Sequence, residues 1–225
     1  MSLQVSKRFV NESINRVMID EFLAKELVAS GYGGVDMTKS PLGTRVTIYA
    51  MRPGLVIGRR GENIRTLSKT LEDKFKLSNP QIAVAEIEVP ELDPRIMASR
   101  LASALERGVH FRKAGFWVLN QITGVGSPGV EIIIRGKLRS MRARYEKFRY
   151  GFFPKAGDPA MRYVREAVVH AKLKQGMLGI KVKIFPPDVS LPDDVRIKEV
   201  RPIEEVEATG SAVLEEEKVD NNKDE

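Results

Sequence analysis

The sequence predicts an α+β fold of two domains followed by an acidic tail. Segments with the 3.6-residue period of an amphipathic helix alternate with short segments whose apolar side chains recur at every second residue, as in a half-buried strand. A first group of these segments ends near Val89, and Asp93-Pro94 then has the pattern of a helix cap followed by a proline in the first turn. The expected domains are residues 1–89 and 90–187, and residues 188–225 are expected to form a disordered tail.

The first domain is expected to have the element order α-β-β-α-α-β. In its second strand, Val46, Ile48 and Ala50 fall on one face. The first helix is expected to bury an apolar stripe that consists of Ile14, Val17, Met18, Phe22, Leu23 and Leu27. In chain order, the expected elements are a helix over 7–30, a hairpin of strands over 35–39 and 44–50, a helical turn over 53–57, a helix over 62–77 and a strand at about 82–89.

The second domain is expected to have two layers, an open sheet and two helices packed on it. The first helix is predicted by apolar residues at every fourth position, which are Met97, Leu101, Leu105 and Val109. In the last strand apolar residues alternate with Lys181 and Lys183, so one face should belong to the core and the other should be basic. The other expected segments are a helix over 111–123, a strand over 130–135, basic loop material over roughly 136–160, and strands over 161–175 and 179–185.

The segment 56–64 has the pattern of a nucleic-acid clamp. Gly58 and Gly61 would let a sugar-phosphate strand approach the backbone, and Arg59 and Arg60 carry charge that can meet phosphates. The helix that follows would point backbone N–H groups and its positive dipole end at the same strand. This is the pattern of the GXXG loop of KH domains, which clamps about four nucleotides of backbone.

Other glycine-rich matches lack the context that their chemistry needs. The G-x-x-G matches at 31–34 and 176–179 predict a helix-ending turn and a hairpin turn. The segment 124–129 matches the dinucleotide fingerprint G-x-G-x-x-G, but a helix precedes it and a strand follows it, which is the reverse of what that fingerprint requires. The segment 136–138 lacks the spacing of a phosphate-binding P-loop. No catalytic arrangement is recognisable, so we expect no enzymatic activity.

The charge is distributed unevenly along the chain. The formal net charge is +7, yet residues 199–225 hold ten Asp/Glu and three Lys/Arg. The rest of the chain therefore holds 20 Asp/Glu and 34 Lys/Arg, a net charge of +14. This balance is typical of a protein that binds a polyanion.

The composition excludes several kinds of site. There is no cysteine, which excludes disulfides, thiolate metal sites and cysteine nucleophiles. Two histidines, His110 and His170, are too few for a histidine-based metal site, and each is interpreted as an ordinary helix or strand residue. No apolar run has the length of a membrane span, and the first residues lack the apolar core of a signal peptide. We therefore expect a cytosolic protein with no metal, no cofactor, no membrane partner and no small-molecule substrate.

A basic stretch with interleaved aromatic residues predicts contact with RNA. The stretch contains seven cations and one acid, Glu146. So many charges of one sign repel one another unless a polyanion is bound. Arginines neutralise phosphates and stack on bases, and aromatic rings offer stacking surfaces. The alternative, a solvated loop whose aromatic side chains cover the sheet, stays open. The cations are Arg135, Lys137, Arg139, Arg142, Arg144, Lys147 and Arg149, and the aromatic residues are Tyr145, Phe148, Tyr150, Phe152 and Phe153.

A smaller basic pair, Arg112 and Lys113, stands at the start of a predicted helix, where cations oppose the helix dipole. Nearby RNA would explain why cations are placed there. The candidate RNA-binding residues are Gly58, Arg59, Arg60, Gly61, Arg65, Arg112, Lys113, Lys137, Arg139, Arg142, Arg144, Lys147 and Arg149.

Over about residues 5–187 the chain resembles a known family, the universal third protein of the small ribosomal subunit. VIGRRGENI resembles the KH signature of that family, and the α-β-β-α-α-β order resembles a type II KH domain. The runs ERGVHFRKAG, VEIIIRGKLRSMRARYEKF and HAKLKQGMLGIKVKIFPP are similar to its C-terminal domain in order and spacing. GDPAMRYV, the Pro-rich ending and the acidic tail are most similar to the archaeal branch.

The resemblance implies a position in the head of the small subunit, beside the tunnel through which mRNA enters. It implies contacts with small-subunit ribosomal RNA, with mRNA and with neighbouring proteins of the head. In the family, basic residues of the first C-terminal-domain helices line that tunnel and help to unwind structured mRNA, and Arg112 and Lys113 fall on those positions. A third such position, basic in bacterial members, is Phe116 here.

Two other functions stay open at this point. The first is a free KH regulator of other RNAs, although the second domain is long and basic and has no second GXXG loop with the right flanks. The second is an enzyme that cleaves damaged DNA through a reactive lysine, as suggested for some eukaryotic relatives. No lysine stands out from the solvated ones, and borohydride trapping on an abasic duplex would detect such a lysine as a covalent adduct.

Overall fold

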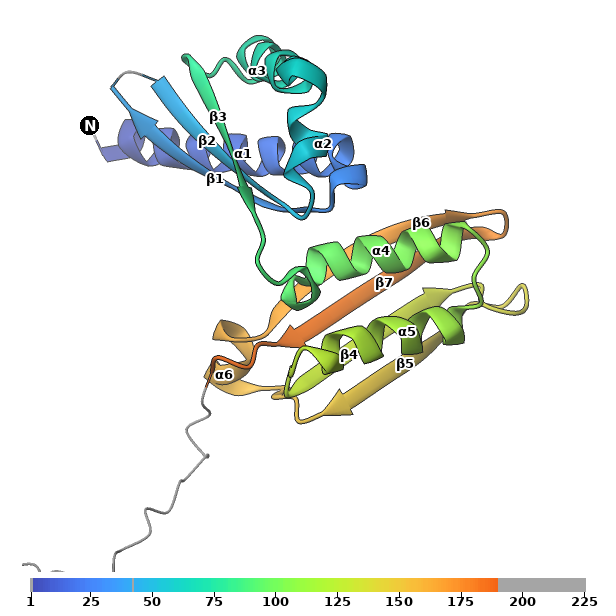
Figure 1. Cartoon of the computed structure of the whole chain (residues 1–225). Helices are drawn as coiled ribbons and strands as arrows, with labels where there is room; N and C mark the ends of the chain where they lie inside the picture. The colour runs from blue at the N-terminus through green and yellow to red at the C-terminus, as the bar shows by residue number, and fades with distance from the viewer. Residues whose placement is uncertain (1, 42, 190–225) are drawn as a thin grey trace, which may run out of the picture. The chain divides into compact units, whose positions relative to one another are not determined.

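The computed structural model describes residues 2–41 and 43–189, which belong to one compact unit. These residues contain two hydrophobic clusters, one in each half of the unit. The predicted α+β class is confirmed, with an open sheet in each half (Figure 1). The predicted boundary between residues 89 and 90 stays a prediction. The predicted tail over 188–225 falls almost entirely outside the described residues.

The first half has the predicted element order, with two additional 3₁₀ turns. Its three-stranded sheet has the order β1-β2-β3, in which β2 is antiparallel to β1 and parallel to β3. The parallel pair requires a crossover, which α2 and α3 supply. The elements are α1 (Ser2–Glu26), η1 (Val28–Ser30), β1 (Tyr32–Ser40), β2 (Gly43–Ala50), α2 (Pro53–Ile57), η2 (Arg59–Gly61), α3 (Glu62–Phe75) and β3 (Pro80–Glu86).

The core of this half lies between β2 and the helices α1 and α3. Val46, Ile48 and Ala50 are fully buried, as the alternation in β2 predicts. Leu67 and Leu71 of α3 pack into the same cluster. The amphipathic period therefore identifies both the strand face and the helix face that meet in this core.

The apolar stripe predicted on α1 is wrong in its N-terminal half. Ile14, Val17 and Met18 are exposed, whereas Ile19 and Leu23 are buried. The helix is 25 residues long and begins at residue 2 rather than 7. Its N-terminal half therefore lies against the sheet through polar side chains, and its apolar side chains face away from that core.

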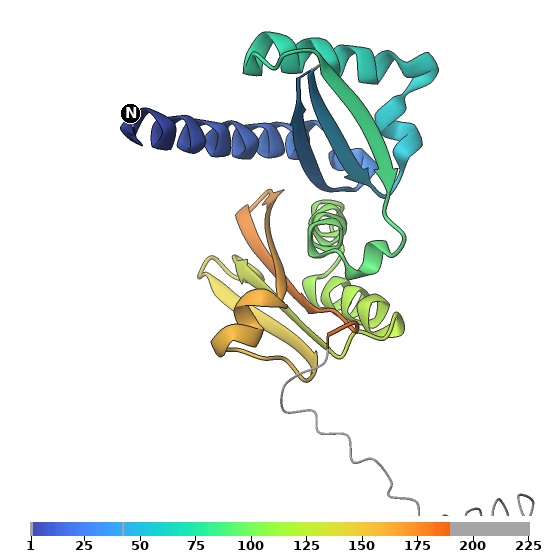
Figure 2. The same ribbon diagram turned by 90° about the vertical axis from the view of Figure 1, so that its left-hand side faces the viewer.

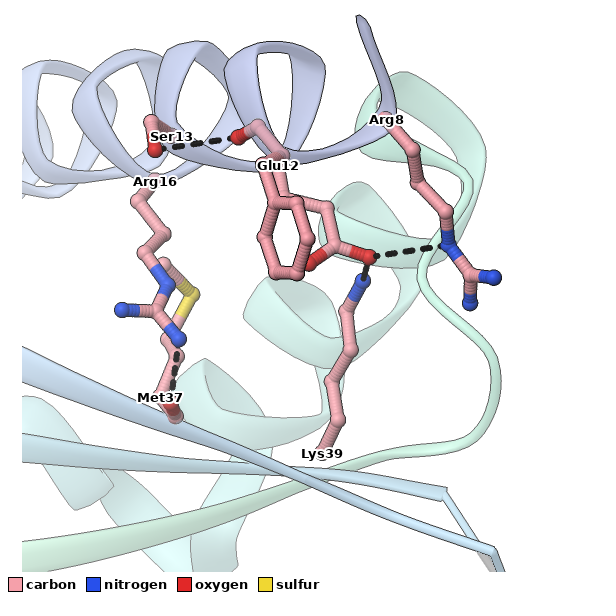
Figure 3. A network of polar contacts seen from close by, with 7 residues as sticks. Arg8, Glu12, Ser13, Arg16, Met37 and Lys39 are labelled. Carbon is pink, nitrogen blue, oxygen red and sulfur yellow. Dashed lines mark hydrogen bonds and ion pairs between the residues drawn. The ribbon is translucent and has the colours of Figure 1, made fainter. Parts of the chain in front are cut away.

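Figure 3 shows these polar contacts. The Glu12 carboxylate accepts a hydrogen bond from Lys39 Nζ of β1 at 2.8 Å and lies 3.6 Å from Arg8 Nε. The hydrogen bond from Lys39 lowers the pKa of Glu12. Arg16 Nη2 donates to the carbonyl oxygen of Met37 at 3.5 Å. Exposed contacts of this kind contribute little to stability, so the buried Ile19 and Leu23 are the main residues that hold this helix on the core.

The second half is a two-layer structure, as predicted. Its sheet has the order β5-β4-β7-β6 with every pair antiparallel, and α4 and α5 cover one face of it (Figures 1 and 2). The elements are η3 (Pro90–Leu92), α4 (Pro94–Glu106), α5 (Phe111–Gly124), β4 (Gly129–Gly136), β5 (Arg144–Gly151), α6 (Gly157–Arg162), β6 (Arg165–Leu173) and β7 (Gly176–Phe185).

The prediction of loop material over roughly 136–160 is wrong in part. This region contains the strand β5 and the start of the helix α6. Six of the eight residues of β5 are exposed and only Phe148 is buried, so its sequence lacks the apolar alternation of a half-buried strand. The hairpin turn predicted at 176–179 is also misplaced, because Leu173 pairs with Gly176 and the turn lies between them.

Two local signals are confirmed. The Asp93 side chain accepts a hydrogen bond from the backbone N–H of Arg95 at 2.9 Å, with Pro94 in the first turn of α4. The segment 124–129 connects a helix to a strand, and the buried Ser127 Oγ donates to the carbonyl oxygen of Phe185 at 2.8 Å. That hydroxyl therefore serves the packing of the loop.

None of the described helices has the length and apolar character needed to cross a bilayer. Over residues 2–41 and 43–189, no group of three or more His, Cys, Asp or Glu side chains is arranged as a metal site.

Candidate nucleic-acid interface

The GXXG segment forms a tight loop between α2 and α3 (Figure 1). Gly58 ends α2 with φ +70° and ψ −178°, and its N–H donates to the carbonyl oxygen of Gly54 at 3.0 Å. Gly61 has the left-handed conformation, φ +74° and ψ 19°, and precedes the first residue of α3. Arg60 between them is also left-handed, at φ 53° and ψ 25°. The chain reverses within four residues because three of them have positive φ.

Arg59, Arg60 and Arg65 are all exposed around this loop. Among the described residues none of the three has a salt-bridge partner. Their charge is therefore available to an external anion. The N-terminus of α3 adds a positive dipole end at the same place. The structure thus brings Gly58, Arg59, Arg60, Gly61 and Arg65 together, and the charges of the three arginines are exposed.

Asn63 is a residue of this loop that the sequence reasoning missed. Its Nδ2 donates to the carbonyl oxygen of Leu55 at 3.1 Å, which joins the first turn of α3 to α2 across the loop. A Cβ atom added to Gly58 would lie 2.6 Å from Asn63 Cγ. The available signal was a hydrogen-bonding amide two residues after the second glycine, but its partner is a backbone carbonyl that the sequence does not identify.

We expect the two glycines of the loop to differ in their tolerance of substitution. Gly58→Ala should cost about 1–3 kcal/mol of stability, because positive φ with extended ψ is essentially restricted to glycine and the new methyl group displaces Asn63. Gly61→Asn should cost less than about 1 kcal/mol, because asparagine adopts the left-handed conformation and no atom lies within 4 Å of the added Cβ. Urea unfolding of both variants measures the difference. Equal costs would contradict this geometry.

Arg112 and Lys113 lie in the first turn of α5, where both are exposed. His110 caps this helix, because its Nδ1 accepts a hydrogen bond from the backbone N–H of Arg112 at 3.3 Å. The sequence reasoning did not identify this cap. Arg112 Nη2 lies 3.6 Å from Glu146 Oε1 of β5, so the single acid of the basic stretch partly neutralises this cation. Among the described residues, Lys113 has no such partner.

Phe116, one turn further along α5, is 55% exposed. Its ring meets the buried ring of Phe148 edge to face, with a centroid distance of 5.2 Å. The third position named by the resemblance therefore presents an aromatic surface next to the basic pair rather than another charge.

The structure divides the basic stretch between two places. Lys137, Arg139 and Arg142 lie in the connection between β4 and β5, and Arg144 begins β5; all four are exposed. Lys147 and Arg149 alternate with the buried Phe148, so they lie on the sheet face opposite α4 and α5. One contiguous run of cations in the sequence is thus split between a connection and the open face of the sheet.

The open face of the sheet carries further cations that the run along the sequence does not include. In β7, Ile180, Val182 and Ile184 are fully buried, which confirms that the alternating Lys181 and Lys183 lie on the other face. Lys147 pairs with the buried Glu131 at 2.7 Å, and Lys181 and Lys183 lie 2.9 and 3.5 Å from Glu166. The hydrogen bond from Lys181 lowers the pKa of Glu166. These acids neutralise part of the positive charge of the face.

The aromatic residues of the stretch have two different roles. Phe148 is 7% exposed and belongs to the core of this half, and Phe153 is 4% exposed, with Lys183 Nζ 5.9 Å from its ring centroid. Tyr145, Tyr150 and Phe152 are exposed. The buried rings fit the alternative in which aromatic side chains cover the sheet, whereas contact of the exposed rings with RNA stays a prediction.

Comparison with known proteins shows what this chain is similar to. A family model described as "KH domain" matches residues 18–92, and one described as "Ribosomal protein S3, C-terminal domain" matches residues 101–184. The chain is 49% identical to "Small ribosomal subunit protein uS3" of Methanobrevibacter smithii over 193 residues, which cover 86% of this chain and 77% of that protein. It is 43% identical to the protein of that name from Methanosphaera stadtmanae over 211 residues, covering 94% and 84%. For Methanothermobacter thermautotrophicus the identity is 47% over 189 residues, covering 84% and 73%.

Proposed function

Because the chain belongs to the uS3 family of small ribosomal subunit proteins, we propose that it binds ribosomal RNA in the head of the subunit and lines the tunnel through which mRNA enters. Its role in the ribosome is structural and not enzymatic, with ribosomal RNA and other ribosomal proteins as partners. Family membership also places it in the cytoplasm, on the ribosome.

The observation that carries the RNA proposal is the geometry of the GXXG loop. Gly58 and Gly61 hold the backbone in conformations that keep side chains away from an approaching strand. Arg59 and Arg60 are exposed and have no acidic partner among the described residues. The arrangement can contact a run of backbone phosphates and does not depend on base identity. The exposed cations Lys137, Arg139, Arg142, Arg144, Lys147 and Arg149 extend the basic surface in the second half.

The proposal for mRNA rests on Arg112 and Lys113. Both side chains are exposed at the start of α5, and Phe116 adds an exposed ring one turn away. A cation holds a single strand by its phosphates, and a ring holds it by its bases. Such a surface would stabilise the unpaired strand beside a melting duplex. No nucleotide hydrolysis is needed, because movement of the mRNA through the ribosome supplies the work.

Arg112→Ala with Lys113→Ala is expected to leave subunit assembly intact and to slow translation of structured mRNA. Each lost contact of a screened, exposed charge is worth about 0.2–1 kcal/mol, which corresponds to roughly 1.4-fold to fivefold per residue. Translation rates of reporters with and without a hairpin measure the effect, and sedimentation measures assembly. Lys155→Ala with Arg162→Ala, two exposed cations of the same half, is the control with the same loss of charge. Failure of the Arg112/Lys113 variant to assemble would instead make these two residues architectural.

A further inference from the structure

A hollow of about 520 Å³ lies at one end of the second sheet. Three segments that are distant in the sequence line it: the connection between α4 and α5, the residues that follow β4, and the hairpin between β6 and β7. Figure 1 shows these three connections at the same end of the domain. Of the residues that line this hollow, only Lys137 is among the candidate RNA-binding residues.

The floor of the hollow is apolar. Leu105 and Leu178 are each 3% exposed, and Phe111 is 5% exposed. Leu138 and Leu173 are partly buried and pack against the same core. The apolar side chains of the lining that solvent reaches are Val109, Leu138 and Leu173, and these are the ones that the flat face of a nucleobase would contact. The exposed His110 ring stands beside the floor, with its centroid 4.4 Å from that of Phe111.

The rim of the hollow is cationic. Arg107, Lys137, Lys172 and Lys174 are exposed around it and come from all three segments. The only acid in the lining is Glu106, and its Oε1 accepts a hydrogen bond from the backbone N–H of Lys172 at 3.1 Å. The four cations therefore outnumber the acid and surround an apolar floor.

We propose that this hollow holds one unstacked nucleotide of single-stranded RNA, with its base on the apolar floor and its phosphates on the cationic rim. The inference rests on the proposed RNA-binding function and extends it to a defined subsite. An apolar pocket with a few polar groups at its edge, in the range of about 300–1,000 Å³, is typical of small-ligand sites. His110 and Phe111, which line the hollow, directly precede Arg112 and Lys113 in the chain. An acidic peptide would use the rim and leave the floor unused.

The first test compares two oligomers on the purified full chain. An oligouridine of about eight nucleotides and an abasic backbone of the same length are titrated at equal salt. The oligouridine should bind roughly fivefold to a hundredfold more tightly, because base stacking adds to phosphate contact. Val109→Glu, which places a carboxylate in the wall of the hollow at an exposed position, should lower this preference at least about threefold. Lys172→Ala with Lys174→Ala should lower the slope of log affinity against log salt by about 0.7 for each phosphate contact that is lost.

Each outcome decides the proposal. Lys155→Ala with Arg162→Ala is the control. It should change neither the preference for oligouridine over the abasic backbone nor the slope of log affinity against log salt. An unchanged preference in the Val109→Glu variant, with RNA binding intact, overturns the hollow as a subsite but leaves the proposed function standing. Absence of RNA binding by the parent chain overturns both. Displacement of the oligomer by polyglutamate, without any preference for bases, identifies an acidic peptide as the occupant and also overturns the proposal.

A second experiment finds which RNA supplies the nucleotide. Purified small subunits are bound to mRNA that carries thiouridine, irradiated and digested, and the crosslinked peptides are identified by mass spectrometry. A thiouridine adduct on a peptide from residues 107–111, 137–138 or 172–175 assigns mRNA as the source. A ribosomal nucleotide on the same peptides assigns ribosomal RNA. Crosslinks that avoid all three segments contradict the proposal.

Discussion

Arg59→Asp combined with Arg60→Asp is expected to lower the affinity of the chain for RNA at least about tenfold at physiological salt. Both guanidinium groups are exposed at the GXXG loop and have no acidic partner among the described residues, so their whole charge is available to phosphates. Each lost phosphate contact should remove roughly 0.7–0.9 from the slope of log affinity against log salt. Titrations at several salt concentrations measure affinity and slope together.

The matched control reverses the same number of charges away from the loop. Lys7→Asp with Lys25→Asp changes two exposed lysines of α1 in the same half of the chain. It alters the net charge equally, so it separates long-range attraction from contact at the loop. If both double variants flatten the slope equally, RNA is attracted by net charge and the loop makes no specific contact.

Gly129→Ala is expected to destabilise the second half by more than about 3 kcal/mol. Gly129 of β4 pairs with Gly151 of β5, and a Cβ added to Gly129 would lie 1.7 Å from the carbonyl oxygen of Phe152. That oxygen belongs to the backbone, where the N–H of Phe152 donates to Pro128 at 3.0 Å. A methyl group therefore cannot be accommodated by a side-chain rotation, and the start of the hairpin must move.

Gly124→Ala is the control for this prediction. Gly124 is the last residue of α5, and no atom lies within 4 Å of the position of its added Cβ. The substitution should be neutral or stabilising by about 0.4–1 kcal/mol, since it restricts the unfolded chain. Urea unfolding of the full chain compares the two variants. A cost below about 1 kcal/mol for Gly129→Ala would show that the two strands are not this close.

The elements that the sequence predicted well are those defined by local signals. The Asp93 cap, the alternation of β2 and the fourth-residue period of α4 each report an interaction within a few residues, although Val109, the last residue of the predicted period, lies beyond α4 and is exposed. The GXXG loop belongs to the same class, because positive φ at Gly58 and Gly61 is a local requirement. These features follow from backbone conformation and periodicity, which a single sequence contains.

The elements that were missed depend on distant partners. β5 has almost no apolar alternation, and it is a strand because β4 pairs with it along its whole length. The face of α1 that meets the sheet combines the buried Ile19 and Leu23 with polar contacts to Lys39 and the Met37 carbonyl of β1. Periodicity identified an apolar stripe on that helix. The polar groups of β1 that contact the helix are distant in the sequence, so periodicity could not identify them.

The candidate site shows the same division. Every candidate cation is exposed, as charged side chains usually are. Which cations share a surface could not be predicted, because the pleat of β5 sends Lys147 and Arg149 to the open face of the sheet. Asn63 and His110 were missed because their roles are hydrogen bonds to the backbone, at Leu55 and Arg112.

Ultraviolet crosslinking in cells, with the RNA bound to this protein mapped by sequencing, tests the central claim most directly. We expect crosslinks concentrated at a few positions of small-subunit ribosomal RNA, together with mRNA crosslinks at a fixed distance downstream of the decoding site. Crosslinks scattered over many transcripts without a ribosomal RNA peak would contradict the account. That result would identify a KH protein that acts on free RNAs.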